Sequence, residues 1–149
     1  MGTGPAQAAS SPSVCIQAHV TDAGWQSQVC NGPNTFYYSG TVGENKAIEA
    51  LRIKITGHGR FCVAAHLRDQ GWHPGEKCFY DGAEVFVGTT GQNRPMEALT
   101  ISVSSGSIVG AGHVQNRGWS PSKANNFIYL GTEGSALNLE AVAVGPNTW

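Results

Sequence analysis

Residues 19–25 read HVTDAGW, and related phrases recur at residues 66–72 (HLRDQGW) and 113–119 (HVQNRGW). Successive histidines of the three phrases are 47 residues apart in both intervals. A phrase that returns at constant spacing indicates an internal structural repeat. The prediction of the fold therefore starts from these three copies.

Two further motifs extend each copy. Gly-Thr pairs at 40–41, 88–89 and 131–132 precede Glu-Ala pairs at 49–50, 97–98 and 140–141 by nine residues in every copy. Because one such unit cannot bury its own apolar face, the three copies predict threefold pseudosymmetry. We expect a disordered lead over residues 1–13, followed by a single domain over 14–149 with repeats at about 14–57, 58–105 and 106–149.

The composition favours an all-β fold. Twenty glycines and seven prolines in 149 residues suit short strands joined by many turns. Repeats of this length made of strands and hairpins favour a β-trefoil, with a β-prism as the alternative. Only 13% of residues are charged and no basic run occurs, which argues against nucleic-acid binding. No apolar stretch approaches the ~20 residues of a membrane span, so we expect no membrane insertion.

Each copy places a carboxylate at the start of its last strand. Glu49 shares the alternation of Leu51, Ile53 and Ile55, so it is expected to face the core. A buried carboxylate needs hydrogen bonds from backbone N–H groups, an indole or a histidine. Two interpretations stay open, a structural buttress or a contact at the rim of a pocket. They apply to Glu49, Glu97 and Glu140.

The cysteines follow the repeat. The first two copies each have two cysteines, whereas the third has Val109 in the first place and Ala124 or Asn125 in the second. Paired presence and paired absence predict a disulfide inside each of the first two units, each stabilising by about 3 kcal/mol. Zinc binding is the alternative, but the spacing is not that of a zinc site. The predicted disulfides, which imply an extracellular environment, are Cys15–Cys30 and Cys62–Cys78.

The repeated phrase gathers a histidine, an Asp or Asn and a tryptophan beside a turn. An aromatic face can cover the C–H surface of a sugar, while the polar groups bond its hydroxyls. A second aromatic group precedes each Gly-Thr pair. Core tryptophans, structural histidines and a plain Asp-x-Gly turn are the competing interpretations. The predicted sugar-binding residues are His19, Asp22, Trp25, His66, Asp69, Trp72, His113, Asn116, Trp119, Tyr38, Phe86 and Tyr129.

The third copy carries a family resemblance. HVQNRGW, followed by GTEG and LEAVAV, resembles the clostridial hydrophobic repeat with its tryptophan, and all three copies match that pattern. Three such repeats in a small disulfide-bearing chain are also similar to the streptomycete hemagglutinins, a lectin family. This resemblance implies a secreted protein that binds L-rhamnose or galactose-type sugars, with up to one site per repeat. Asn116 stands where the other copies have aspartate, so the third site is expected to differ in affinity or ligand.

We therefore expect a multivalent, non-catalytic lectin that binds cell-surface glycans as a monomer, without a cofactor or metal. A glycoside hydrolase using Glu49 and Asp22 is disfavoured, because catalysis needs one differentiated carboxylate pair in one cleft. A metal held by the three repeated histidines around the threefold axis is also disfavoured, since strand alternation does not require them to point there. The alternative function is a protein-binding adhesion module that uses the exposed aromatic residues near Tyr37.

Overall fold

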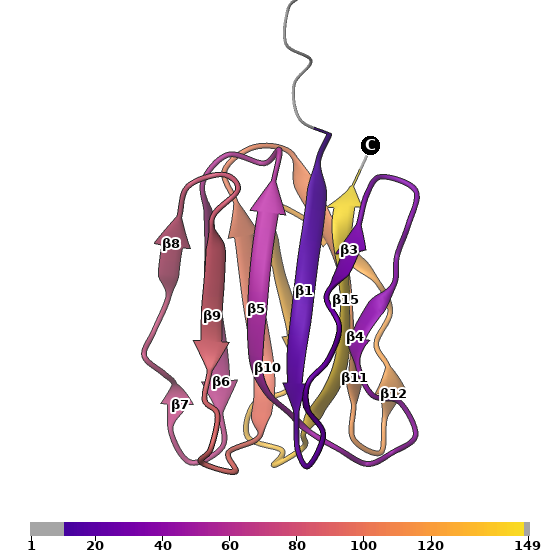
Figure 1. The fold of residues 1–149 in the computed structure, drawn as a ribbon, viewed down its shortest axis with the longest axis vertical. Helices are drawn as coiled ribbons and strands as arrows, with labels where there is room; N and C mark the ends of the chain where they lie inside the picture. Colours follow the sequence, from indigo (N-terminus) through magenta and orange to yellow (C-terminus); the bar gives the residue numbers. More distant parts are fainter. Residues whose placement is uncertain (1–10, 148–149) are drawn as a thin grey trace, which may run out of the picture.

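The computed structural model describes residues 11–147, in which the regular elements are β-strands. They form three antiparallel sheets of equivalent composition (Figure 1). The predicted all-β fold with threefold pseudosymmetry is thereby confirmed. Within these residues no helix is long and apolar enough to cross a membrane.

The three sheets share one strand order. The first consists of β2 (Gly24–Trp25), β1 (Ser13–Val20), β5 (Ile48–Thr56) and β9 (Glu84–Gly88), with β3 (Val29–Asn31) also paired to β1. The second consists of β7 (Gly71–Trp72), β6 (Phe61–Leu67), β10 (Met96–Val103) and β14 (Phe127–Gly131), with β8 (Lys77–Phe79) also paired to β6. The third consists of β12 (Gly118–Trp119), β11 (Ser107–Val114), β15 (Leu139–Asn147) and β4 (Tyr38–Gly40), with β13 (Lys123–Asn125) also paired to β11.

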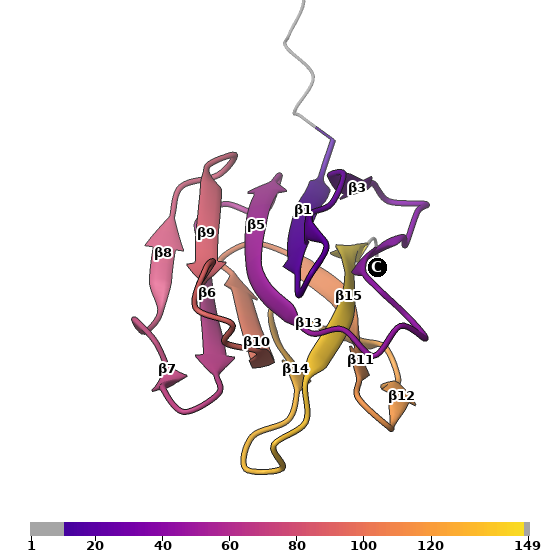
Figure 2. The ribbon, with the colours of Figure 1, turned by 60° about the horizontal axis from the view of Figure 1, so that its bottom comes forward.

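Each sheet takes its last strand from a different repeat. β9 of the second repeat pairs with β5 of the first, and β14 of the third pairs with β10 of the second. β4 of the first repeat then pairs with β15 of the third. Figure 2 shows the three sheets arranged around a common centre. The exchange is cyclic, so no repeat completes its own sheet.

The preference for a trefoil over a prism stays a prediction. The described strands group as three separate sheets. Of the expected disordered lead, residues 1–10 lie outside the described residues. Ser13 belongs to β1 rather than to the lead, because it pairs with Thr56 of β5.

The core fills the space between the three sheets. β1 alternates between partly exposed and buried residues along its whole length, as a strand with one buried face should. Its buried side chains join equivalent aliphatic residues of the other two sheets in one cluster. Leu51, Leu99 and Val142, which are equivalent in the three repeats, are all fully buried. Packing of the inner faces therefore explains the repeated aliphatic pattern.

The Gly-Thr pairs hold the exchanged strands. Gly88 has a φ of +91°, and a Cβ there would lie 2.3 Å from the carbonyl oxygen of Glu49. The next residue, Thr89, donates its backbone N–H to that same oxygen over 3.0 Å. Gly40 and Gly131 have the same close approach to Glu140 and Glu97. Only glycine fits this conformation at this distance, which explains why the pair recurs.

Both predicted disulfides are confirmed. Cys15 is bonded to Cys30 and Cys62 to Cys78, and each bond joins directly opposed residues of two paired strands. In the third repeat Val109 faces Ala124 at the same place in the ladder. The apolar pair therefore takes the position of the disulfide.

Gly88→Ala should lower the free energy of unfolding by about 3 kcal/mol, since the added methyl group meets backbone in a left-handed conformation. Gly82→Ala is the matched control. Gly82 also has a positive φ, but a Cβ there meets nothing within 4 Å, so its cost should be about 1 kcal/mol. Urea unfolding of both variants measures the difference. Equal losses would show that the close approach to Glu49 does not limit stability.

Candidate functional site

Three polar pockets lie where β1, β6 and β11 turn back at one end of the molecule. This end is the bottom of Figure 1, where β7 and β12 are seen. The pockets have volumes of about 450, 560 and 480 Å³ in the first, second and third sheets. Each is lined by the histidine, the Asp or Asn and the glutamate of one repeat. These are the residues of the repeated phrase and of the Glu-Ala pair.

A histidine–glutamate pair forms the floor of each pocket. The distances from histidine Nδ1 to glutamate Oε1 are 3.1 Å for His19–Glu49, 3.1 Å for His66–Glu97 and 3.0 Å for His113–Glu140. The three glutamates are only 5–6% exposed. An ionised carboxylate only accepts hydrogen bonds, so Nδ1 carries the proton and the Nε2 edge is left for other partners. The expected burial of the glutamates and their bonding to histidine are confirmed.

A β-bulge aims each glutamate at its histidine. In the first sheet His19 pairs with Ala50 and Val20 pairs with Ile48, which leaves Glu49 as the extra residue. The same shift surrounds Glu97 and Glu140. Bulges commonly redirect a side chain beside a functional site. The bulge here places a carboxylate at the pocket instead of among the aliphatic residues.

The turn after each histidine sets the position of the Asp or Asn. Asp22, Asp69 and Asn116 have φ values of 62°, 65° and 63°, in the left-handed region that Asp and Asn tolerate well. In the first turn Ala23 donates its backbone N–H to the Val20 carbonyl over 3.0 Å. All three side chains are exposed and line their pockets. The Asp-x-Gly sequence therefore builds a turn and also presents a polar group.

The second wall of each pocket comes from the repeat that supplies the exchanged strand. Gly91 and Asn93 line the first pocket, Gly134 and Ala136 the second, and Gly43 and Asn45 the third. These loop residues were not among the predicted site residues. The sequence pattern that could have identified them is Gly-x-Asn, which follows two of the three Gly-Thr pairs. In the structure Asn45 and Asn93 have left-handed φ values of 53° and 51°.

The tryptophans lie beside the pockets, on the outer faces of the sheets. Each indole makes a T-shaped contact with its histidine, with ring centroids 5.1 to 5.3 Å apart. Its other neighbour is the predicted second aromatic residue, supplied by the exchanged strand: Trp25–Phe86, Trp72–Tyr129 and Trp119–Tyr38. Trp72 and Trp119 are 36% and 41% exposed, so they are not core residues. The predicted site residues thus form two adjoining surfaces, a polar pocket and an aromatic pair.

The second pocket has additional charged groups. Arg68 lies 3.3 Å from the Glu97 carboxylate and donates to Asn138 over 2.6 Å. Glu133 accepts hydrogen bonds from the Trp72 indole over 3.3 Å and from the Tyr129 hydroxyl over 3.0 Å. Thr21 and Gln115 take the place of Arg68 in the other two pockets. The three pockets therefore share a floor and differ at the rim.

Each of the three repeated histidines turns its Nδ1 to the glutamate of its own repeat. Within residues 11–147, one group of three potential ligands lies close together, Cys62, Glu76 and Cys78. Its two sulfur atoms are bonded to each other. This group therefore offers no thiolate to a metal.

The Clostridial hydrophobic W (ChW) family model matches the chain three times, at residues 19–57, 66–105 and 113–145. These stretches cover most of the chain and coincide with the three structural repeats. The chain therefore belongs to the ChW family. No curated protein and no solved structure matches it.

Tyr129 should titrate at unusually high pH. Burial, the hydrogen bond to Glu133 and the charges of Glu133 and Glu97 raise its pKa from 10.0 to about 12. Because the folded protein holds this proton more tightly than the unfolded chain, the stabilisation is complete below pH 10 and is lost as the pH rises towards 12. Ultraviolet titration of tyrosinate, with Tyr129→Phe to assign the step, should show a lower pKa in Glu133→Gln. An unchanged step would mean that Glu133 does not control this hydroxyl.

Proposed function

We propose that this protein is a secreted, non-catalytic lectin that binds one monosaccharide in each polar pocket. The observation that carries the proposal is the threefold occurrence of one pocket, with the same His–Glu floor, at one end of the domain. L-rhamnose and galactose-type sugars on cell surfaces are the proposed ligands, on the basis of the resemblance to streptomycete hemagglutinins.

The chemistry of the pocket suits a sugar. In the first pocket the buried Glu49 carboxylate, the exposed Asp22 carboxylate and the Asn93 side chain surround His19 within about 450 Å³. Carboxylate and amide oxygens and the free imidazole Nε2 accept hydrogen bonds from hydroxyl groups, and an amide N–H can donate to them. Such charge-assisted bonds to fixed groups can select the orientation of neighbouring hydroxyls. A volume of this size suits a small ligand.

The repetition supports binding rather than catalysis. Glu49 and Asp22 line one pocket, as the hydrolase alternative requires, but the third pocket replaces the aspartate by Asn116. Glycosidases need two carboxyl groups in distinct roles on either side of the scissile bond. In each pocket the glutamate already has a histidine partner. A binding role asks only that each copy hold a ligand.

Three weak sites on one rigid body would act together. A shallow monosaccharide site binds in the millimolar range, about −4 kcal/mol. Simultaneous contact with a surface that displays the sugar can raise the apparent affinity 10²–10⁴-fold. The turns that carry the pocket residues lie at the same end of the molecule (Figure 1), so a monomer could present the three pockets together. The two disulfides fit an extracellular setting for this role.

Agglutination of red cells tests the proposal. We expect the protein to agglutinate cells, and free L-rhamnose or D-galactose to inhibit the reaction at millimolar concentration. Agglutination that no sugar blocks would contradict the proposal and favour the adhesion module, with the exposed Tyr37 and its neighbours as the contact surface.

Glycine substitutions test the pockets without straining the turns. Asp22→Gly, Asp69→Gly and Asn116→Gly each remove a pocket side chain where φ is already positive, so stability should change by less than about 1 kcal/mol. Loss of one working site should lower the agglutination titre on the order of 10-fold. Glu76→Gln, an exposed substitution outside the pockets, is the control. Unchanged titres in all three glycine variants would exclude the polar pockets as the sugar sites.

A further inference from the structure

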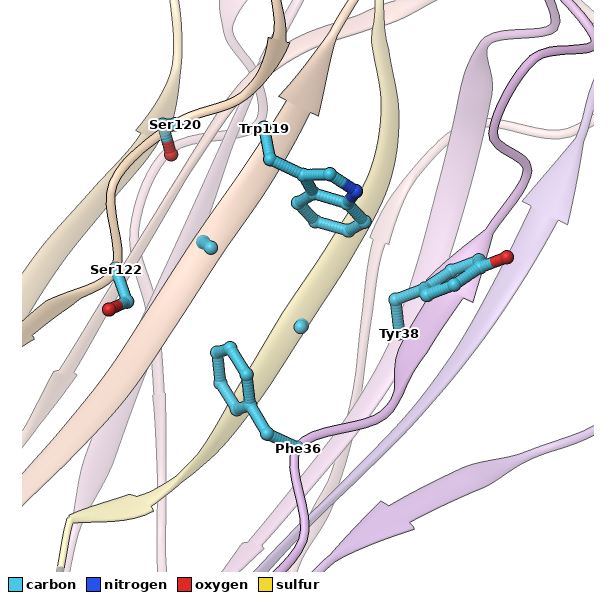
Figure 3. Close-up of a pocket in the computed structure, with 7 residues that line it drawn as sticks. Phe36, Tyr38, Trp119, Ser120 and Ser122 are labelled. Atoms are coloured by element: carbon cyan, nitrogen blue, oxygen red, sulfur yellow. The ribbon is translucent and has the colours of Figure 1, made fainter.

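An aromatic groove on the outer face of the third sheet is separate from the polar pockets. Trp119, Tyr38 and Phe36 surround it, with Ser120 and Ser122 along one side (Figure 3). The small side chains of Ala111 and Ala143 form its floor, and its volume is about 350 Å³. All three residues are more than 40% exposed, with Phe36 and Tyr38 supplied by the first repeat and Trp119 by the third. The groove therefore opens to solvent.

Comparison of equivalent positions shows how the groove arises. One row of residues crosses each sheet beneath its tryptophan: Gln17–Arg52–Phe86 in the first sheet, Ala64–Thr100–Tyr129 in the second and Ala111–Ala143–Tyr38 in the third. The second and third rows have short side chains in the places of Gln17 and Arg52, and the third row has the smallest pair, two alanines, beside its aromatic residue. The groove is the space that the arginine of the first sheet would occupy.

The first sheet shows which chemical group this space accommodates. The Arg52 guanidinium carbon lies 4.2 Å from the centre of the Trp25 ring, which also packs against Phe86. Arg52 donates to the Gln17 side chain over 3.3 Å and lies 3.9 Å from the Glu84 carboxylate. A guanidinium on a tryptophan face is a favourable cation–π arrangement. The chain thus fills one copy of the aromatic pair with its own cation.

The third sheet has an additional ring in place of the carboxylate. Phe36 lies two residues before Tyr38, as Glu84 lies two residues before Phe86. A cation in the groove would meet three rings and two serine hydroxyls but no carboxylate among the lining residues. This set favours a weakly hydrated, planar cation over the strongly hydrated ammonium of lysine. It also allows the serine oxygens to accept guanidinium hydrogen bonds.

We infer that the groove binds the guanidinium group of an arginine side chain from a partner peptide or protein. The bound arginine takes the place that Arg52 has in the first sheet. Its guanidinium lies against Trp119, and its aliphatic part lies over Ala111 and Ala143. This site shares no lining residue with the sugar pockets, so a lectin could bind a peptide and a glycan at the same time.

Nuclear magnetic resonance titration of the indole N–H signals tests the inference. N-acetyl-L-arginine amide should shift the Trp119 signal, assigned with Trp119→Phe, in a saturable way with a millimolar Kd. N-acetyl-L-citrulline amide has the same shape without the charge and should bind at least about 10-fold more weakly. Equal binding of the two probes would overturn the inference, since the groove would then be selecting shape and not charge.

Two reciprocal variants place the ligand. Ala143→Arg should fill the groove as Arg52 fills its own and abolish the Trp119 shift, with an unchanged near-ultraviolet dichroism spectrum as the check on folding. Arg52→Ala should open the first sheet and add a saturable shift of the Trp25 signal. Persistent Trp119 binding in folded Ala143→Arg, or no response of Trp25 in Arg52→Ala, would contradict the assignment. Competition by D-galactose would instead make the groove a sugar site, whereas the polar pockets are tested separately by agglutination.

Discussion

The contact between the Gly-Thr pair of one repeat and the Glu-Ala pair of the preceding one is the constraint on which the rest of the structure depends. The threonine N–H groups donate to the carbonyl oxygens of Glu49, Glu97 and Glu140, each over 3.0 Å. The adjoining glycines let the two backbones approach closely enough for the exchanged strand to enter the ladder. The three contacts follow one another around the molecule and close the ring of sheets. A single repeat has no partner for this contact.

The same glutamates connect the fold to the site. The main-chain oxygen of Glu49 holds the exchanged strand, and its side chain accepts a hydrogen bond from His19 at the floor of the pocket. The strand held in this way then supplies the opposite wall of that pocket, including Asn93. It also brings Phe86 against Trp25 on the outer face. A pocket and an aromatic pair thus arise together wherever two successive repeats meet. The repeats can therefore vary, as at Arg68 on the rim of a polar pocket and at Ala143 on the floor of the aromatic groove, while keeping the same arrangement of strands.

Much of this arrangement follows from sequence, and the exceptions have physical causes. Spacing alone predicted the repeats and both disulfides, because these depend on equivalent positions within one unit. Alternation predicted the burial of Glu49, but not the bulge, since an extra residue in a ladder depends on the partner strand. The exchange of one strand between successive repeats was also not predicted. β9 and β4 occupy equivalent positions in their repeats, so either could pair with β5, and the sequence does not distinguish between them. The separation of Trp25 from Asp22 could not be predicted either, because it depends on the direction in which the sheet presents each side chain.

Disulfide mapping would test the cyclic exchange most directly. Lys54 of β5 lies opposite Glu84 of the second repeat, whereas Phe36 is the equivalent residue of its own repeat. A chain that carries Lys54→Cys, Glu84→Cys and Phe36→Cys can be oxidised in the folded state and mapped by mass spectrometry of its peptides. If the strands are exchanged between repeats, a disulfide should form between positions 54 and 84, and position 36 should bond to neither of them. A bond between positions 54 and 36 would mean that each repeat closes on itself, and it would contradict the shared construction of the pockets.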